Sequence, residues 1–197
     1  VDNAARMLGF PVGPLQLVDE TSIDLGAKIA RATKAAMGEN YPDSAVDDVL
    51  FWMESKGRLG RKAKAGFFSY DAQGKRLGYW EGLSAQYPLT AQQPDLIDVQ
   101  HRLIFVQSLE AVRALEEGVL MDIREGDVGA ILGWGFAPWS GGPFSWLDIL
   151  GSPYAAERCN QLHHAYGDRF ACPDLLRSMA SKGQSFYGQA KKAQSAA

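Results

Sequence analysis

One cysteine and two histidines form the most metal-like group in the sequence. Cys159 and His163 are four positions apart and would share one face of a helix, with His164 beside them. A carboxylate or a second cysteine close by would be needed to complete a metal site. The spacing is equally typical of a half-buried cysteine with two surface imidazoles, and we therefore predict no metal site in this chain.

His101 is the second candidate for chemistry. Asp98 precedes it by three positions on a predicted helix, a spacing that lets the two side chains touch and could raise the imidazole pKa. Such a pair could act as acid and base, but a simple surface contact explains the same spacing and is the favoured interpretation. We predict no catalytic residue in this chain.

Two segments could meet an anion. Trp139-Ser140-Gly141-Gly142-Pro143 could present backbone amides at the start of a helix, although a tight loop between packed helices needs the same residues and is favoured. The run Arg58–Lys64 places four cations in seven residues and could meet a polyphosphate. A solvated loop explains that run as well.

Signatures of the common cofactor sites are absent from the 197 residues. The sequence contains no Gly-x-Gly-x-x-Gly, no Gly-x-x-x-x-Gly-Lys-Ser/Thr and no His-Glu-x-x-His. These are the patterns that bind dinucleotides, nucleotide phosphates and catalytic zinc. We therefore predict no cofactor-binding residue in this chain.

Composition indicates a folded protein of the cytoplasm. Hydrophobic residues make up 46% of the chain and charged residues 22%, which is ordinary usage. A balance of 20 Lys+Arg against 23 Asp+Glu argues against nucleic acid or an anionic membrane as a partner. No apolar stretch of 18 residues predicts a membrane span, and Cys159 and Cys172 are expected to be reduced thiols.

The sequence contains an internal repeat. Gly9-Phe10-Pro11 recurs 126 positions later as Gly135-Phe136-Ala137-Pro138, and Met53–Gly57 recurs with the same offset as Met179–Gly183. Between these anchors, Leu17-Val18-Asp19 corresponds to Trp146-Leu147-Asp148. Three ordered elements predict a duplicated unit.

Both copies are predicted to be helical. Apolar periodicity with capping residues predicts helices over 44–57, 152–167 and 173–183, with Ser44 and Ser152 as N-caps. The longest pattern runs from Ile97 to Glu117, stops at Gly118 and predicts one long buried helix. Residues 66–74 predict a short extended segment at most.

The remaining segments predict a connector and two ends. Glycines and prolines within 71–94 suit a connector, which puts one domain at 1–88 and a second at 89–197. The tail 189–197 is expected to fray. Residues 2–8 read as a short helix with no preceding element to pack on, which indicates a fragment of a longer polypeptide.

An ordered set of motifs in the first copy resembles the C-terminal domain of the 3-hydroxyacyl-CoA dehydrogenase family. The family pattern runs Gly-Phe/Tyr-Pro-Met-Gly-Pro, a downstream Asp and a closing Gly-x-x-Gly-x-Lys-x-Gly-x-Gly-Phe-Tyr. The matching residues are Gly9–Pro14, Leu17, Asp19, Asp24, Gly57–Lys62 and Gly66–Tyr70. The chain departs from the pattern at Val12, where the family usually has Met, and at Ala63 and Ala65.

The second copy is similar to a second such domain. Its matching residues are Glu110–Gly118, Asp127, Gly133–Pro138, Gly141–Phe144 and Asp148. The tandem is typical of multifunctional fatty-acid oxidation proteins, which join enoyl-CoA hydratase to the dehydrogenase. The resemblance implies an all-α fold of two helical domains, similar to the C-terminal domain of 6-phosphogluconate dehydrogenase and related by a pseudo-two-fold axis.

The resemblance also implies a function. The family oxidises the 3-hydroxyl of an acyl-CoA with NAD, and a Rossmann domain that cannot be mapped onto this sequence supplies the NAD site and the catalytic histidine. The fragment alone is expected to be inactive. Its expected substrate-binding residues are Phe10, Pro11, Val12, Gly13 and Pro14, although a loop that only packs helices would use the same residues.

Two expectations about partners complete the interpretation. The helix that would correspond to the stretch around Leu109–Gly118 of the second copy is missing from the first copy. The surface that it would cover should therefore be open or be filled by another chain, with a homo-oligomer as one outcome. The alternative to a dehydrogenase region is a non-catalytic helical interaction module that assembles a larger complex.

Overall fold

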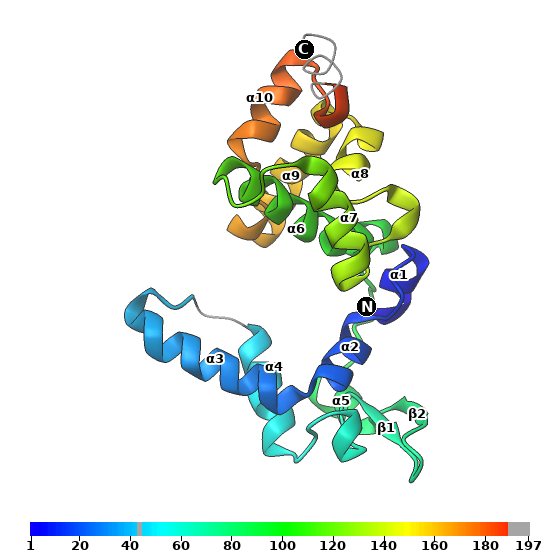
Figure 1. Cartoon of the computed structure of the whole chain (residues 1–197). Helices are drawn as coiled ribbons and strands as arrows, with labels where there is room; N and C mark the ends of the chain where they lie inside the picture. Colours follow the sequence, from blue (N-terminus) through cyan, green and yellow to red (C-terminus); the bar gives the residue numbers. More distant parts are fainter. Residues whose placement is uncertain (43–44, 189–197) are drawn as a thin grey trace. The chain divides into compact units, whose positions relative to one another are not determined.

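The computed structural model describes residues 1–42 and 45–188, so the predicted N-cap Ser44 and the tail 189–197 lie outside the described residues. Contacts divide the chain into two compact units (Figure 1). The first unit contains residues 1–2 and 12–93, and the second contains 3–11 together with the described part of 94–197. Helix α1 (Asp2–Met7) therefore begins in the first unit and continues in the second.

The predominantly helical prediction is confirmed. In the first unit the helices are α2 (Pro14–Thr21), α3 (Ile23–Met37), α4 (Ala45–Ser55) and α5 (Glu81–Gln86), with 3-10 turns η1 (Gly38–Asn40) and η2 (Arg61–Ala63). In the second unit they are α6 (Leu96–Glu116), α7 (Ile123–Trp134), α8 (Pro143–Leu150), α9 (Ser152–Tyr166) and α10 (Asp174–Lys182), with η3 (Pro138–Ser140) and η4 (Asp168–Phe170). Among the described residues, no helix has the length and apolar character needed to cross a membrane.

The core of the second unit is built on α6. Ile104, Phe105, Leu109 and Val112 on this helix are fully buried, and the helix packs against α8 and α10. Gly118 stops the helix with a φ of 70°, as predicted. Ile97, at the start of the helix, does not belong to this buried face, because its side chain is 54% exposed.

The first unit has a smaller core. Its buried cluster consists of five residues, Ile23, Met53, Phe67, Phe68 and Tyr70. Three large apolar side chains four or eight positions apart on α3 remain exposed: Leu25 (49%), Ile29 (57%) and Met37 (44%). This exposed stripe fits the prediction of an uncovered surface on the first unit.

The connector prediction for 71–94 is wrong as far as residue 86. Strands β1 (Phe68–Tyr70) and β2 (Arg76–Tyr79) form an antiparallel hairpin, and α5 follows. Asp71 stabilises the turn by accepting from the amides of Gln73 (2.9 Å) and Lys75 (2.8 Å). Cross-strand stacking adds to this, because the rings of Phe68 and Tyr79 lie 4.4 Å apart. Such pairing depends on contacts that periodicity within one strand does not reveal.

Helix ends match the predictions with one shift. Gly57, Gly167 and Gly183 follow their helices with positive φ, as predicted for C-terminal stops. Ser152, predicted as an N-cap, is instead the first residue of α9, and Gly151 occupies the cap position. The Ser152 hydroxyl donates to the Gln184 carbonyl (2.6 Å), a distant partner that a local pattern could not indicate.

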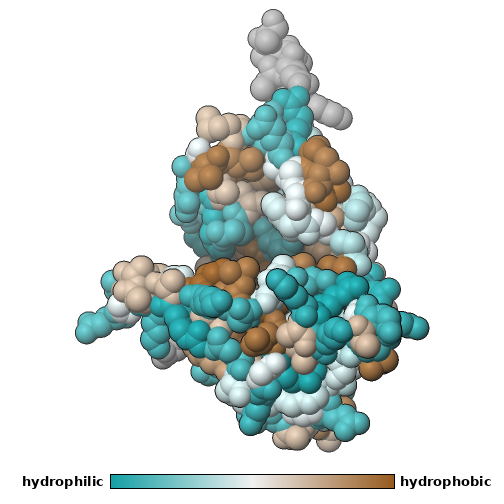
Figure 2. All heavy atoms as spheres, turned by 60° about the horizontal axis from the view of Figure 1, so that its bottom comes forward, coloured by the Kyte–Doolittle hydropathy of each residue, from teal (hydrophilic) through white to brown (hydrophobic). Residues whose placement is uncertain are grey.

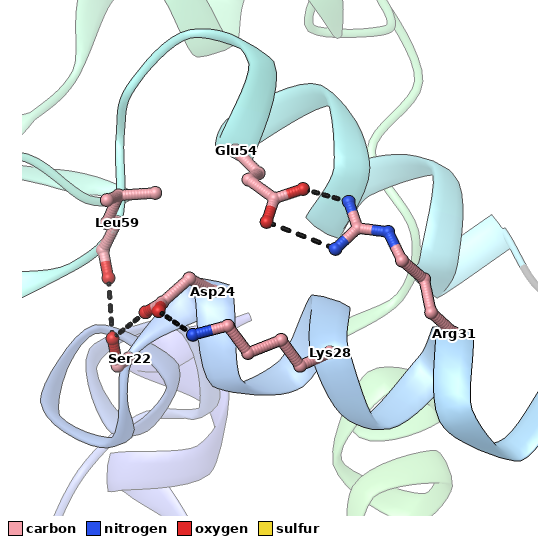
Figure 3. A network of polar contacts seen from close by, with 6 residues as sticks. All are labelled: Ser22, Asp24, Lys28, Arg31, Glu54 and Leu59. Atoms are coloured by element: carbon pink, nitrogen blue, oxygen red, sulfur yellow. Dashed lines mark hydrogen bonds and ion pairs between the residues drawn. The ribbon is translucent and has the colours of Figure 1, made fainter.

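Ser22 joins α2 to α3 in a conformation that suits glycine. Its φ and ψ are 85° and 124°, and Gly151, which joins α8 to α9, has nearly the same values, 82° and 134°. Figure 3 shows the Ser22 hydroxyl beside the Asp24 carboxylate and the Leu59 carbonyl, to which Oγ lies at 3.2 Å. These polar contacts offset part of the cost of positive φ in a residue with a side chain.

We expect Ser22→Gly to be more stable than Ser22→Ala by about 1 kcal/mol, because alanine keeps the strained φ without the hydroxyl contacts. Urea unfolding of both variants measures the difference. At Ala32, an exposed position within α3, the order reverses, and Ala32→Gly loses about 1 kcal/mol against the parent. Equal stability of the two Ser22 variants would contradict the interpretation.

Candidate functional site

A buried carboxylate links α2 to the β1 segment within the first unit. Asp19 on α2 is 1% exposed, and it accepts hydrogen bonds from the amides of Phe67 (2.7 Å) and Phe68 (3.0 Å) and from the Tyr70 hydroxyl (2.8 Å). These donors replace the water that a carboxylate loses on burial. Burial and the hydrogen bond to Asp19 raise the pKa of Tyr70, so the phenol stays protonated and continues to donate. The contact ties the β1 segment to α2.

Close packing around Asp19 explains two glycines of the closing motif. A Cβ on Gly66 would overlap the Asp19 carboxylate, and one on Gly60 would lie 2.5 Å from the Asp19 carbonyl oxygen. Gly60 also has a φ of 115°, which residues with side chains rarely adopt. Both positions therefore require glycine for the carboxylate to reach the amides of β1.

A second carboxylate caps α2. Asp2 accepts from the amides of Leu15 (2.8 Å) and Gln16 (3.2 Å) in the first turn of that helix. Pro14 begins the helix, where its missing N–H costs nothing. Gly13 lies directly against Asp2, and a Cβ there would overlap the Asp2 side chain. The cap therefore requires glycine at position 13 and tolerates the proline at position 14.

The second unit contains both kinds of carboxylate contact, a helix cap and a link to a later segment. Asp127 on α7 accepts from the amides of Phe144 (2.8 Å) and Ser145 (3.1 Å) at the start of α8. Asp148 on α8 accepts from the amides of Phe186 (2.8 Å) and Tyr187 (2.9 Å). Asp127 thus corresponds to Asp2 and Asp148 to Asp19, which supports the predicted duplication at the level of individual hydrogen bonds.

The tyrosine hydroxyl has a different partner in the second unit. Tyr70 donates to Asp19, but Tyr187 donates to Asp127 (2.9 Å), the carboxylate that also caps α8. Burial, followed by this hydrogen bond, raises the pKa of Tyr187 to about 12. The two copies therefore keep the same polar groups while connecting them differently.

The glycine-rich segment before α8 is a tight loop, as the favoured interpretation predicted. The amides of Phe144 and Ser145 at this helix start are already bound by Asp127, so the backbone amides considered for an external anion have a partner within the chain. Gly142 allows this approach with a φ of 114°, since a Cβ there would lie 2.5 Å from the Asp127 side chain.

The five predicted substrate-binding residues are divided between the units. Phe10 is half-buried in the second unit, with its ring edge-on to Phe136 at 5.8 Å. Pro11 is exposed and lies against Gly135. Val12 is half-buried at the start of the first unit, followed by Gly13 and Pro14. Each residue thus has a place in one unit, and substrate binding by the loop stays a prediction.

His101 forms its hydrogen bond with Arg158 rather than with Asp98, so the structure shows no hydrogen-bonded acid–base pair at this spacing. The His101 Nδ1 atom accepts from Arg158 Nε on α9 (2.9 Å). Asp98 instead accepts from Arg158 (2.7 Å) and from the Tyr166 hydroxyl (2.6 Å). Burial, and then the Arg158 charge, lower the pKa of His101 and favour the neutral ring. Arg158 lies 57 positions from His101, so local spacing gave no signal for it.

Cys159, His163 and His164 do not come together in one site. Cys159 and Cys172 are free and buried, and contact with Cys172 together with burial raises the pKa of Cys159. His163 is exposed and pairs with Asp168 (2.8 Å). Within residues 1–42 and 45–188, no three His, Cys, Asp or Glu side chains gather as a metal site would require.

The cationic run is more ordered than a solvated loop. Arg58 donates to the carbonyls of Gly66 (2.6 Å) and Phe68 (2.9 Å), and its guanidinium lies 4.4 Å from the Trp80 ring centroid. Arg61 and Lys64 donate to carbonyls of the hairpin turn. Burial lowers the pKa of Arg58. Arg58 is therefore a structural residue, because its hydrogen bonds fasten the segment that also binds Asp19.

The first part of this helical chain matches a known class of domain. Residues 1–70 match the family model for the C-terminal domain of 3-hydroxyacyl-CoA dehydrogenase. The matched stretch contains Asp2, Asp19 and the glycines that pack against them.

Curated relatives extend the similarity along the chain. The chain is 39% identical over 188 residues to the fatty acid oxidation complex subunit alpha of Shewanella loihica and 38% identical over 191 residues to that of Vibrio vulnificus. Each alignment covers 95% of this chain and 26% of the relative. The chain therefore spans about a quarter of the length of the curated relatives it matches.

Two crystal structures share the fold. A 3-hydroxybutyryl-CoA dehydrogenase from Escherichia coli is 20% identical, with a TM-score of 0.64 over 92% of this chain and 54% of its own. The dehydrogenase part of multifunctional enzyme 1 from C. elegans is 22% identical, with a TM-score of 0.64 over 90% of this chain and 41% of its own. At these identities the likeness establishes the fold alone.

We expect Asp19→Asn to lower the free energy of unfolding by about 3 kcal/mol, because an amide NH2 would face the N–H and O–H donors that the carboxylate accepts. Urea denaturation followed by circular dichroism measures the loss. Glu20→Gln, on the exposed side of the same helix, should change the value by no more than about 0.5 kcal/mol. A loss at Asp19 no larger than at Glu20 would contradict the assigned role.

Proposed function

We propose that this chain is the helical, substrate-side region of an NAD-dependent 3-hydroxyacyl-CoA dehydrogenase of fatty acid oxidation, working in the cytoplasm. One observation carries the proposal. The first 70 residues match the C-terminal domain of that dehydrogenase, and similarity to fatty acid oxidation proteins continues over 95% of the chain. The substrate in this proposal is a 3-hydroxyacyl-CoA.

Hydride transfer would take place on a nucleotide-binding domain outside these 197 residues. NAD held by that domain would supply the hydride acceptor, and an imidazole of the same domain would take the hydroxyl proton. The part left to this chain is to shape the acyl pocket and to hold the substrate in position. A rigid scaffold suits that role, because small displacements of a bound substrate reduce the rate strongly.

The loop Phe10–Pro14 is our candidate for the substrate-facing segment. Two fixed contacts support this proposal. Phe10 is held at one end by Phe136 within the second unit, and Pro14 is held at the other by the Asp2 cap of α2 within the first. Within the first unit, the cap that holds Gly13 and Pro14 keeps the neighbouring apolar side chain of Val12 in a defined place.

The exposed stripe on α3 is our candidate for a surface covered in the assembled protein. Leu25, Ile29 and Met37 present apolar area to solvent, which in a soluble protein favours burial against a further helix or a second copy of this chain. A homo-oligomer formed through this stripe is part of the proposal.

Reconstitution tests the proposed activity. The chain is co-expressed with the NAD-binding portion of a fatty acid oxidation complex subunit alpha, and NADH formation from a 3-hydroxyacyl-CoA is followed by absorbance. We expect turnover in the mixture and none from the chain alone. Val12→Asp should lower kcat/KM about tenfold or more, corresponding to about 1.4 kcal/mol of transition-state binding.

Val119→Asp is the matched control, since Val119 is exposed outside the loop and the same substitution should change kcat/KM less than twofold. Stable capture of the NAD-binding portion without any NADH formation would instead favour the second candidate, a non-catalytic helical interaction module. The exposed stripe on α3 is the observation that favours that alternative.

A further inference from the structure

Helix α2 and the β-hairpin of the first unit form a pocket that the proposed dehydrogenase function does not use. Its volume is about 390 Å3, within the usual range for small-ligand sites. Residues that line it include Gln16, Glu20, Arg61, Tyr70, Lys75 and Arg76. Figure 2 shows a broad hydrophilic area on the face of the molecule turned toward the viewer.

The charges of the pocket favour an anion. Arg61, Lys75 and Arg76 contribute three positive charges, and Glu20 contributes one negative charge. The lining therefore has a formal excess of two positive charges, although the chain as a whole has a net charge of −3. A phosphate monoester, which carries nearly two negative charges near neutral pH, matches this excess.

Both arginines are held in place before any ligand arrives. Arg61 donates to Glu20 (2.8 Å) and to the Gly74 carbonyl (3.2 Å). Arg76 donates to the Gln16 side chain (2.8 Å), and its guanidinium lies 4.6 Å from the Phe68 ring centroid. Each guanidinium has five N–H donors, so these contacts leave donors available for a phosphate.

Lys75 differs from the two arginines. Like them it is exposed, but among the described residues its ammonium group has no ion-pair partner. An ammonium can follow an anion as a mobile point charge, whereas the held guanidinium groups offer forked hydrogen bonds. The pocket thus combines two fixed donors with one adaptable charge.

One lining residue of the pocket, Arg61, lies in a segment that is longer in the first unit than in the second. Ten positions separate Gly57 from Phe67, but three separate Gly183 from Phe186 in the second unit. The second unit still forms both carboxylate contacts, through Asp127 and Asp148, with that short connection. The second unit therefore forms its contacts without a counterpart of Arg61, so this side chain is available to serve a ligand.

We infer that this pocket binds the dianionic phosphate of a phosphate ester, with Arg61 and Arg76 donating to its oxygens and Lys75 balancing its charge. The phosphomonoester on the nucleotide part of coenzyme A and free inorganic phosphate are two sources of the same group. The inference does not rest on the proposed dehydrogenase function, because either source can be tested with the 197-residue chain.

Isothermal titration calorimetry at low ionic strength, with inorganic phosphate and with coenzyme A as separate probes, tests the inference. We expect saturable binding of at least one probe, weakened threefold or more by Lys75→Gln and by Arg76→Gln. Lys34→Gln is the matched control, because it removes the same charge from an exposed position on α3 and should leave binding unchanged. Added salt should weaken binding.

Each outcome is decisive. Tighter binding of coenzyme A than of phosphate supports a coenzyme A site, and equal binding supports a site for phosphate groups in general. Absence of binding by both probes at millimolar concentration overturns the inference, and so does equal weakening by Lys34→Gln and Lys75→Gln. Binding by the pocket with no turnover in reconstitution would leave this inference standing while the proposed function fails.

Discussion

Burial of a carboxylate is tolerated only when hydrogen-bond donors replace its water, and this constraint organises both units. Asp19 and Asp127 are almost fully buried, and each accepts from two backbone amides and a tyrosine hydroxyl. Asp2 and Asp148 complete the pattern. The glycines that pack against Asp2, Asp19 and Asp127 follow from the need to bring backbone amides to these carboxylates.

Local patterns predicted the helices because their causes are local. Apolar periodicity and terminal glycines were sufficient for α6, α9 and α10, and the repeat located equivalent positions in the two copies. The hairpin and the partners of His101 depend on residues distant in sequence, which no window along the chain contains. The carboxylate contacts left one signal, because Asp19 and Asp148 occupy the same place in the repeat, but their donors could not be read from it.

The comparison of the two units separates scaffold from function. What both copies keep, the two carboxylate contacts and the helices they join, is what the fold requires. Within the described residues, the second unit has no counterpart of the cationic segment or of the hairpin. A duplicated fold can preserve stability in both copies while one of them acquires ligand or partner surfaces. The family match, which covers residues 1–70, falls on that same copy.

Amide hydrogen exchange followed by NMR tests the central role of the buried carboxylates most directly. The amide of Phe67 lies outside the helices and strands, and that of Phe186 is the first of a helical stretch, where it has no acceptor within the helix. Their bonds to Asp19 and Asp148 predict exchange as slow as that of the helical core of their own unit, such as Met53 and Leu176. Exchange of Phe67 and Phe186 as fast as that of exposed residues in 89–93 would contradict the account.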